Sequence, residues 1–242
     1  MRCKGMIFDM DGTLLDSMGM WRSLDSEFLR AHGIEPPPDI SDIVKTMTVE
    51  EGSAYYAERF GLGISPQQVS DEIEAMAAEA YRERLLLKPC AREFLLSARK
   101  RGIPCAVASA TYSKLLAAAL ERLRIRQEFL CVLTPQEGYA GKDTPELYFA
   151  AAERIGAKPE EIIVFEDALH AAETAKKAGF YVIGIADALY ADTWQEMQAV
   201  CDRTICGWEE ICTDAFFAEI GAEPYYSGTE SNHHEKTVSG NR

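Results

Sequence analysis

The stretch KGMIFDMDGTLLDS, residues 4–17, places three acidic side chains at or just after the end of a short apolar run. Residues 5–8 predict a short buried strand that ends at Asp9. Asp9 and Asp11 then lie two positions apart, where the strand gives way to a loop. Because crowded carboxylates repel one another, a magnesium ion bound by their hard oxygen atoms would resolve the repulsion. Magnesium also binds phosphate oxygens, so the pair suggests phosphoryl chemistry; an acidic surface turn capped by Gly12 is the alternative.

Further apolar runs along the chain predict strands at residues 103–109, 129–134, 161–167, 181–187 and 203–207. Most are apolar throughout, which indicates burial on both faces of a sheet. Helical patterns separate them at residues 90–102, 111–123, 144–156 and 168–179, the third with Thr144 as its expected N-cap. Such alternation predicts an α/β fold with a doubly wound, Rossmann-like parallel sheet. Ligands bind such sheets beyond the carboxyl ends of the strands, where Asp9, Ser109 and Asp167 fall.

Residues 18–87 interrupt this alternation, because they contain helical patterns and no convincing strand. Capping boxes predict helices that begin at Thr48 and Ser65. We therefore expect a catalytic core made of residues 1–17 and 88–225, with an all-helical cap domain inserted at residues 18–87.

The last segment, residues 226–242, is polar and lacks periodicity, so we expect it to be disordered. His233 and His234 could bind a metal loosely, but a solvated tail is the preferred interpretation.

The composition of the chain excludes some kinds of binding partner and indicates the cellular compartment. The net charge of −14 argues against nucleic acid as a partner. No apolar segment is long enough to cross a membrane, and the first apolar run is too short for a signal peptide. None of the seven cysteines has CxxC spacing, and Cys105 and Cys131 lie in apolar runs as reduced core residues do. We expect a cytoplasmic protein, and a monomer because no repeat or coiled-coil pattern is present.

Motifs occur in order along the chain: DMDGT at 9–13, VASA at 107–110, GKDTPELY at 141–148 and VFEDA at 164–168. Together, and in this strand context, they resemble the haloacid dehalogenase-like (HAD) hydrolase superfamily, in the phosphatase and beta-phosphoglucomutase-like branch with a helical C1-type cap. The resemblance covers residue 4 to about residue 220. It implies a Mg²⁺-dependent phosphatase that hydrolyses a small phosphate monoester through an aspartyl-phosphate.

The resemblance also implies a role for each acidic residue of the motifs. Asp9 would be the nucleophile and Asp11 the general acid and base, which must hold a proton for part of the cycle. Asp9, the backbone carbonyl of Asp11 and Asp167 would bind the metal, with Glu166 in support. Asp16 lies at the junction of core and cap, where it would either contact substrate or cap the following helix.

The phosphoryl group would be bound by Thr13, Ser109, the amide of Ala110 and Lys142. Ser109 has an alternative interpretation as a helix N-cap or loop serine, and Lys142 has one as a solvated lysine after Gly141. For the fourth-motif acids the alternative is a pair at the start of the next helix.

Five residues depart from the family pattern: Asp143, Glu146, Ala168, His170 and Ala171. Asp143 stands beside Lys142 and would weaken its cationic role. His170 could contact a ligand, although a helix-surface histidine is the preferred interpretation.

A lid that closes over the pocket favours a small phosphorylated metabolite: a sugar phosphate, a polyol phosphate or a nucleoside monophosphate. The first alternative is a beta-phosphoglucomutase-like mutase, but those mutases have a cap histidine where this chain has Trp21. Dehalogenation and phosphonate cleavage are disfavoured, because those branches lack the second aspartate. A non-catalytic phosphometabolite-binding protein is the alternative of another class, and Asp11 argues against it, because a binder needs no proton-shuttling acid.

Overall fold

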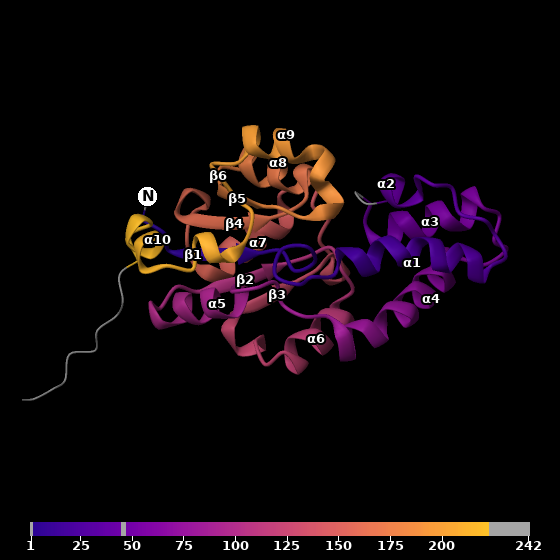
Figure 1. Cartoon of the computed structure of the whole chain (residues 1–242), viewed down its shortest axis with the longest axis horizontal. Coiled ribbons are helices and arrows are strands. Elements are labelled where there is room, and N and C mark those ends of the chain that lie inside the picture. The colour runs from indigo at the N-terminus through magenta and orange to yellow at the C-terminus, as the bar shows by residue number, and fades with distance from the viewer. Residues whose placement is uncertain (1, 45–46, 223–242) are drawn as a thin grey trace, which may run out of the picture.

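The computed structural model describes residues 2–44 and 47–222. At its centre lies a sheet of six strands in the order β3-β2-β1-β4-β5-β6 (Figure 1). The strands are Gly5–Phe8 (β1), Cys105–Ala108 (β2), Cys131–Leu133 (β3), Ile162–Glu166 (β4), Tyr181–Ile185 (β5) and Arg203–Ile205 (β6). All neighbouring pairs are parallel, so the predicted strands and the α/β class are confirmed.

Helices cover both faces of the sheet because successive side chains of a strand point in opposite directions. In β1, Met6 and Phe8 belong to one hydrophobic cluster and Ile7 to another. The first cluster is closed by α5 (Ala91–Lys100), α6 (Ser113–Arg122) and α10 (Asp214–Glu219). The second is closed by α7 (Glu146–Ile155), α8 (Leu169–Lys177) and α9 (Trp194–Val200). The sheet is therefore doubly wound, with β1 buried at its centre.

The predicted cap region contains α1 (Met18–Ala31), α2 (Ile40–Val44), α3 (Val49–Arg59) and α4 (Pro66–Glu79). One π-helical turn, η1 (Ala80–Arg84), continues α4. These helices have a hydrophobic cluster of their own, formed by Phe28, Leu29, Ile40, Tyr56 and Val69. Figure 1 shows them at one end of the sheet, on the right. The division into a core and a cap stays a prediction.

Two crossings join these helices to the sheet, and they lie side by side. Leu15 and Leu87 form an isolated antiparallel bridge. On either side of it, the N–H of Asp16 donates to the carbonyl of Leu86 at 2.9 Å, and the N–H of Lys88 donates to the carbonyl of Leu14 at 2.8 Å.

Of the three helix starts that were predicted from N-cap residues, the structure confirms two. The capping boxes at Thr48 and Ser65 are present. The prediction of Thr144 as an N-cap is wrong, since α7 begins after Pro145 and the Thr144 hydroxyl contacts the carbonyl of Gly141 at 3.5 Å. Helices α2, α9 and α10 were not predicted, because five to seven residues are too few to show helical periodicity.

The seven cysteines, all within the described residues, are free, and Cys105 and Cys131 are buried as predicted. Within residues 2–44 and 47–222, no helix has both the length and the apolar character needed to span a membrane. The predicted disordered tail, residues 226–242, lies outside the described residues.

Candidate active site

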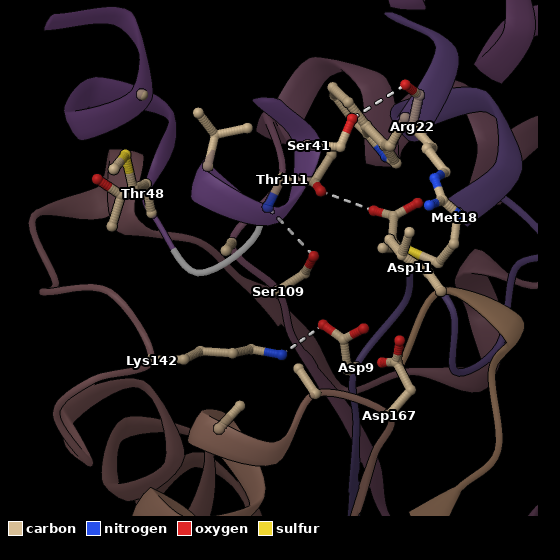
Figure 2. Close-up of a pocket in the computed structure, with 18 of the residues that line it drawn as sticks. Asp9, Asp11, Met18, Arg22, Ser41, Thr48, Ser109, Thr111, Lys142 and Asp167 are labelled. Carbon is tan, nitrogen blue, oxygen red and sulfur yellow. Dashed lines mark hydrogen bonds and ion pairs between the residues drawn. The ribbon is translucent and has the colours of Figure 1, made fainter. Parts of the chain in front are cut away.

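The carboxyl ends of β2, β1 and β4 bring predicted site residues together, because these strands are neighbours in the sheet. Asp9 directly follows β1, Ser109 follows β2, and Glu166 ends β4 with Asp167 next. A cavity of about 210 Å³ lies above them, and residues of α1 and α3 form its opposite wall. Figure 2 shows Asp9, Lys142 and Ser109 converging at the floor of this cavity.

Three buried carboxylates form that floor. Asp9, Glu166 and Asp167 each offer an oxygen within 4.8 Å of the others, and their exposed fractions are only 7%, 1% and 3%. The Lys142 ammonium contacts Asp9 and lies 2.5 Å from Oε1 of Glu166. The Tyr148 hydroxyl donates to the same Glu166 oxygen at 2.6 Å. One ammonium balances only part of the charge of three carboxylates, and buried unbalanced charge is costly.

Burial first, and the neighbouring charges second, shift the pKa values of these groups. Burial raises the pKa of Asp9 from 3.8 to about 7, although the Lys142 ammonium opposes the rise. Burial, with Asp9 and Glu166 as neighbours, raises the pKa of Asp167 well above its usual range. Burial by itself would lower the pKa of Lys142, but the two carboxylates that it contacts outweigh this and raise it. A bound cation would favour the ionised carboxylates.

Asp167 carries the atom that fits a divalent cation most directly. Its Oδ1 accepts a hydrogen bond from Thr13 Oγ1 at 2.9 Å, whereas its buried Oδ2 has no hydrogen-bond partner among the described residues. An unpaired buried carboxylate oxygen is costly, and hard oxygens of this kind are preferred ligands of Mg²⁺. Gly12, at φ +81°, lies against this carboxylate at a point where a β-carbon would overlap it. The donor set and its unpaired atom fit a divalent cation.

Asp11 lines the same cavity but has hydroxyl partners. Ser17 and Tyr81 donate to its Oδ1 at 2.6 and 2.5 Å, and Thr111 donates to its Oδ2 at 2.6 Å (Figure 2). The two aspartates of the first motif therefore have different surroundings: Asp9 lies among charged groups and Asp11 among neutral hydroxyls. Such a difference allows two carboxyl groups to have different roles in one reaction.

The residues predicted to bind a phosphoryl group lie mostly along one side of the cavity. Ser109, Ala110 and Lys142 all line it. Lys142 is 6% exposed, so the alternative of a solvated lysine is wrong. Ser109 is not the N-cap of α6, since that position belongs to Tyr112, and its Oγ accepts the N–H of Thr111 at 3.3 Å.

Two predicted site residues do not line the cavity. Thr13 is fully buried, and its hydroxyl is used on Asp167. Asp16 is exposed and is not among the residues that line the cavity. The alternative that Asp16 caps the following helix is wrong, because Ser17 holds the N-cap position of α1 and makes no side-chain cap bond.

The departures from the family pattern leave the charged centre intact. Asp143 is exposed, and Lys142 contacts Asp9 and Glu166 instead. Oε2 of Glu146 accepts the N–H of Ala140 at 3.0 Å. His170 lines the cavity, so the interpretation as a helix-surface histidine is wrong, and burial lowers its pKa.

The wall opposite the carboxylates comes from the predicted cap and is partly polar. Its polar side chains belong to Arg22, Asp25, Ser41, Thr48, Ser53 and Tyr56. Tyr56 donates to Oδ1 of Asp25 at 2.8 Å, and Ser41 donates to the carbonyl of Arg22 at 3.1 Å. Burial raises the pKa of Asp25. Among the described lining residues, this wall offers one guanidinium and one carboxylate, so it carries little net charge.

Sequence reasoning missed several polar residues that line the cavity or contact the catalytic candidates. Tyr148 ends the third motif, and Thr111 follows Ser109 by two positions, so a search for hydroxyls near the motifs could have found both. Tyr81 and Asp25 lie in ordinary helical patterns far from any motif, and no local signal separates them from their neighbours.

Comparison with known proteins gives one family and several similar proteins. The sequence model of the haloacid dehalogenase-like hydrolases matches residues 3–179. The phosphorylated carbohydrates phosphatase of Thermotoga maritima is 26% identical over 187 residues, which cover 77% of this chain and 87% of that protein. Hexitol phosphatase A of Escherichia coli is 28% identical over 186 residues, or 76% and 84% of the two chains. A beta-phosphoglucomutase structure from Clostridium difficile, 16% identical, has the same fold with a TM-score of 0.75 over 90% of this chain and 96% of that one.

Proposed function

The chain belongs to the haloacid dehalogenase-like hydrolases, and from this premise we propose that it is a magnesium-dependent phosphatase of small sugar or polyol phosphates. The reaction proceeds through an aspartyl-phosphate on Asp9. One observation carries the proposal: Asp9 is buried between the Lys142 ammonium and the carboxylate of Asp167, on the floor of a cavity that Asp11 also lines.

In the first step, Asp9 acts as the nucleophile. A carboxylate oxygen of Asp9 attacks phosphorus, the bond between phosphorus and the ester oxygen breaks, and the phosphoryl group is carried by Asp9. Lys142 and Ser109 line the cavity beside Asp9, where they stabilise the negative charge of the transferred group.

Asp11 serves both halves of the reaction. It first gives a proton to the ester oxygen, so that the leaving group departs as a neutral alcohol. It then takes a proton from the water that attacks the aspartyl-phosphate, which releases inorganic phosphate and restores Asp9.

Asp9, Asp167 and the backbone carbonyl of Asp11 would hold the magnesium ion, with Glu166 in support. When bound, the ion would supply positive charge to the phosphoryl oxygens and the carboxylates. The unpaired Oδ2 of Asp167 supports this assignment. Thr13 has a supporting role, since its hydroxyl donates to the other oxygen of Asp167.

The substrate class follows from the wall opposite the carboxylates, which we assign to a cap domain at residues 18–87. A wall with hydroxyl groups, one cation and one anion can hydrogen-bond an uncharged polyhydroxylated group. It offers no surplus cation, among the described residues, for a second phosphate. The names of two relatives, a phosphorylated carbohydrates phosphatase and a hexitol phosphatase, support the same class. We also propose that the protein works as a monomer in the cytoplasm.

The test is phosphate release from a panel of sugar, polyol and nucleoside monophosphates in the presence of Mg²⁺. We expect turnover of sugar or polyol phosphates, and we expect EDTA or Asp9→Asn to abolish it. Asp143→Asn is the matched control, because this carboxylate is exposed and next to Lys142.

Other outcomes would favour other functions. Preference for a nucleoside monophosphate would contradict the substrate class but not the chemistry. Isomerisation of a glucose phosphate without phosphate release would indicate a mutase. Saturable binding of an ester without turnover would indicate a binding protein.

A further inference from the structure

We propose that Tyr81 is a positioning residue for the acid–base step, and that its hydroxyl fixes the orientation of the Asp11 carboxylate. The inference rests on the proposed phosphatase function, in which Asp11 protonates the leaving group. Tyr81 lies in the predicted cap, residues 18–87, and in none of the four motifs, so the proposal gives a role in the reaction to a residue that the motifs do not include.

The contact between the two side chains is short and shielded from solvent. The Tyr81 hydroxyl lies 2.5 Å from Oδ1 of Asp11, although the residues are 70 positions apart in the chain. Tyr81 has no exposed surface. A hydrogen bond to a carboxylate is stronger than one between neutral groups, so this contact restrains the Asp11 side chain.

Trp21 determines which way the Tyr81 hydroxyl points. The indole Nε1 of Trp21 donates to the Tyr81 oxygen at 2.9 Å. Because an indole N–H can only donate, the Tyr81 oxygen must accept on that side. Its own hydrogen is then left for Asp11.

The partners of Asp11 also distinguish its two oxygens. Oδ1 accepts from Ser17 and Tyr81, neither of which lines the cavity, whereas Oδ2 contacts Thr111, which does. Oδ1 is therefore the anchored oxygen. Oδ2 is the oxygen on the cavity side, where it can exchange a proton with the substrate.

The backbone around Tyr81 is itself restrained. Tyr81 lies in the π-helical turn η1, in which the N–H of Leu85 donates to the carbonyl of Ala80 at 2.9 Å. Arg122 of α6 donates to the carbonyl of Tyr81 at 3.1 Å and also contacts the carbonyl of Leu85. π-Helical turns inside helices often occur at functional sites. Asp11, which follows β1, is therefore contacted by a residue from the helices of the predicted cap.

The leaving group of the substrate gives a test that separates positioning from general damage. A sugar or polyol alkoxide needs a proton in order to leave, whereas p-nitrophenolate leaves without one. We expect Tyr81→Phe to lower kcat/KM at least about 10-fold for the alkyl ester that the wild-type enzyme hydrolyses fastest, since general acid catalysis typically contributes about 10²–10⁴-fold. For p-nitrophenyl phosphate we expect a change of less than about twofold.

Two further variants sharpen the comparison. Trp21→Phe keeps an aromatic ring but loses the N–H donor, so it should lower the alkyl-to-aryl ratio of kcat/KM in the same direction and by less. Tyr181→Phe is the matched control, because it removes a tyrosine hydroxyl at the start of β5, away from the cavity. Its ratio should equal that of the wild type.

Several results would overturn the inference. Equal slowing of both esters by Tyr81→Phe would show a structural role only, and unchanged or faster alkyl hydrolysis would show that Tyr81 does not assist Asp11. If the wild-type protein hydrolyses neither ester, the proposed function itself fails, and this result is distinct from the others.

Discussion

Individual carboxylates at the floor of the cavity lie where they weaken the fold. Asp9, Glu166 and Asp167 are buried together, and Lys142 is the cation that contacts two of them. Burial of like charges opposes folding unless protons or cations neutralise them. The chemistry that we propose would explain their arrangement, because phosphoryl transfer through Asp9 needs a nucleophile beside a carboxylate that binds a cation.

The pKa of Asp9 leads to a prediction about stability and pH. In the folded, metal-free protein this pKa is about 7, against 3.8 ordinarily. Between those values the folded state binds the extra proton, so the free energy of unfolding falls as pH rises from about 4 to about 7. We expect Asp9→Asn to match the wild type near pH 4 and to exceed it above pH 7, by on the order of a few kcal/mol. Thermal unfolding in EDTA across this range measures the difference.

Asp9→Asn also removes a charge that raises the pKa of Asp167, so the difference between the two curves reports Asp9 together with the groups coupled to it. Parallel curves for the wild type and Asp9→Asn would contradict the prediction, because they would mean that Asp9 ionises equally easily in the folded and unfolded chains.

At the scale of secondary structure, the junction of α4 with η1 decides where Tyr81 points. Helix α4 begins at a capping box and ends at Glu79, and one π turn then brings Tyr81 to Asp11. From α6, Arg122 contacts the carbonyl of Tyr81 in this turn and the carbonyl of Leu85 directly after it. The guanidinium therefore replaces bonds that a regular helix would have made internally.

Removing that guanidinium should loosen the turn. We expect Arg122→Met to lower the free energy of unfolding by about 1–3 kcal/mol, since backbone carbonyls lose their donors. It should also lower the alkyl-to-aryl ratio of kcat/KM, because Tyr81 would be held less firmly. Denaturant unfolding and steady-state kinetics measure the two effects.

Arg126→Met is the matched control, since Arg126 donates to a single carbonyl, that of Phe129, at 2.8 Å. It should lose some stability and keep the wild-type ratio. If Arg122→Met also kept the ratio, the turn would not control Tyr81.

In the whole molecule, the chain crosses between the sheet and the helices of the predicted cap at two segments that lie side by side. The bridge between Leu15 and Leu87 joins the two crossings. Directly after the second crossing, Lys88 forms an ion pair with Asp187 at 2.9 Å, at the carboxyl end of β5. The side chains of this pair are only 14% and 8% exposed. The cavity lies next to these crossings, since Asp11 and Met18, on either side of the first one, both line it.

Because the proposed cation ligands follow two different strands, β1 and β4, magnesium binding should stabilise the entire fold. A ligand that binds only the folded state stabilises it by about 2.7 kcal/mol at about 100 times its Kd. We expect Mg²⁺ to raise the Tm of the wild-type protein at neutral pH, measured by calorimetry. Asp167→Asn should lose most of this increase, whereas Asp143→Asn should retain it.

A Tm increase of equal size in Asp167→Asn would mean that the ion binds elsewhere. No increase in the wild type at millimolar Mg²⁺ would contradict the metal assignment.

The strands, the doubly wound sheet and the meeting of Asp9, Ser109 and Asp167 at one edge were all predictable from the sequence. The reason is physical: apolar runs of strand length must be buried on both faces, and parallel strands joined by helices bring their carboxyl ends to one edge. The motif order added Lys142 to the same group. The patterns that predict strands and helices are local, because each is read from a short run of neighbouring residues.

Only the tertiary structure decided which groups touch. Thr13 bonds to Asp167 across 154 positions, Lys142 contacts Asp9 across 133, and Tyr81 reaches Asp11 across 70. Such contacts depend on how helices pack against the sheet and on where a π turn replaces an α turn. No periodic pattern encodes them, because a tyrosine that anchors an acid has the same local sequence pattern as one that fills a core.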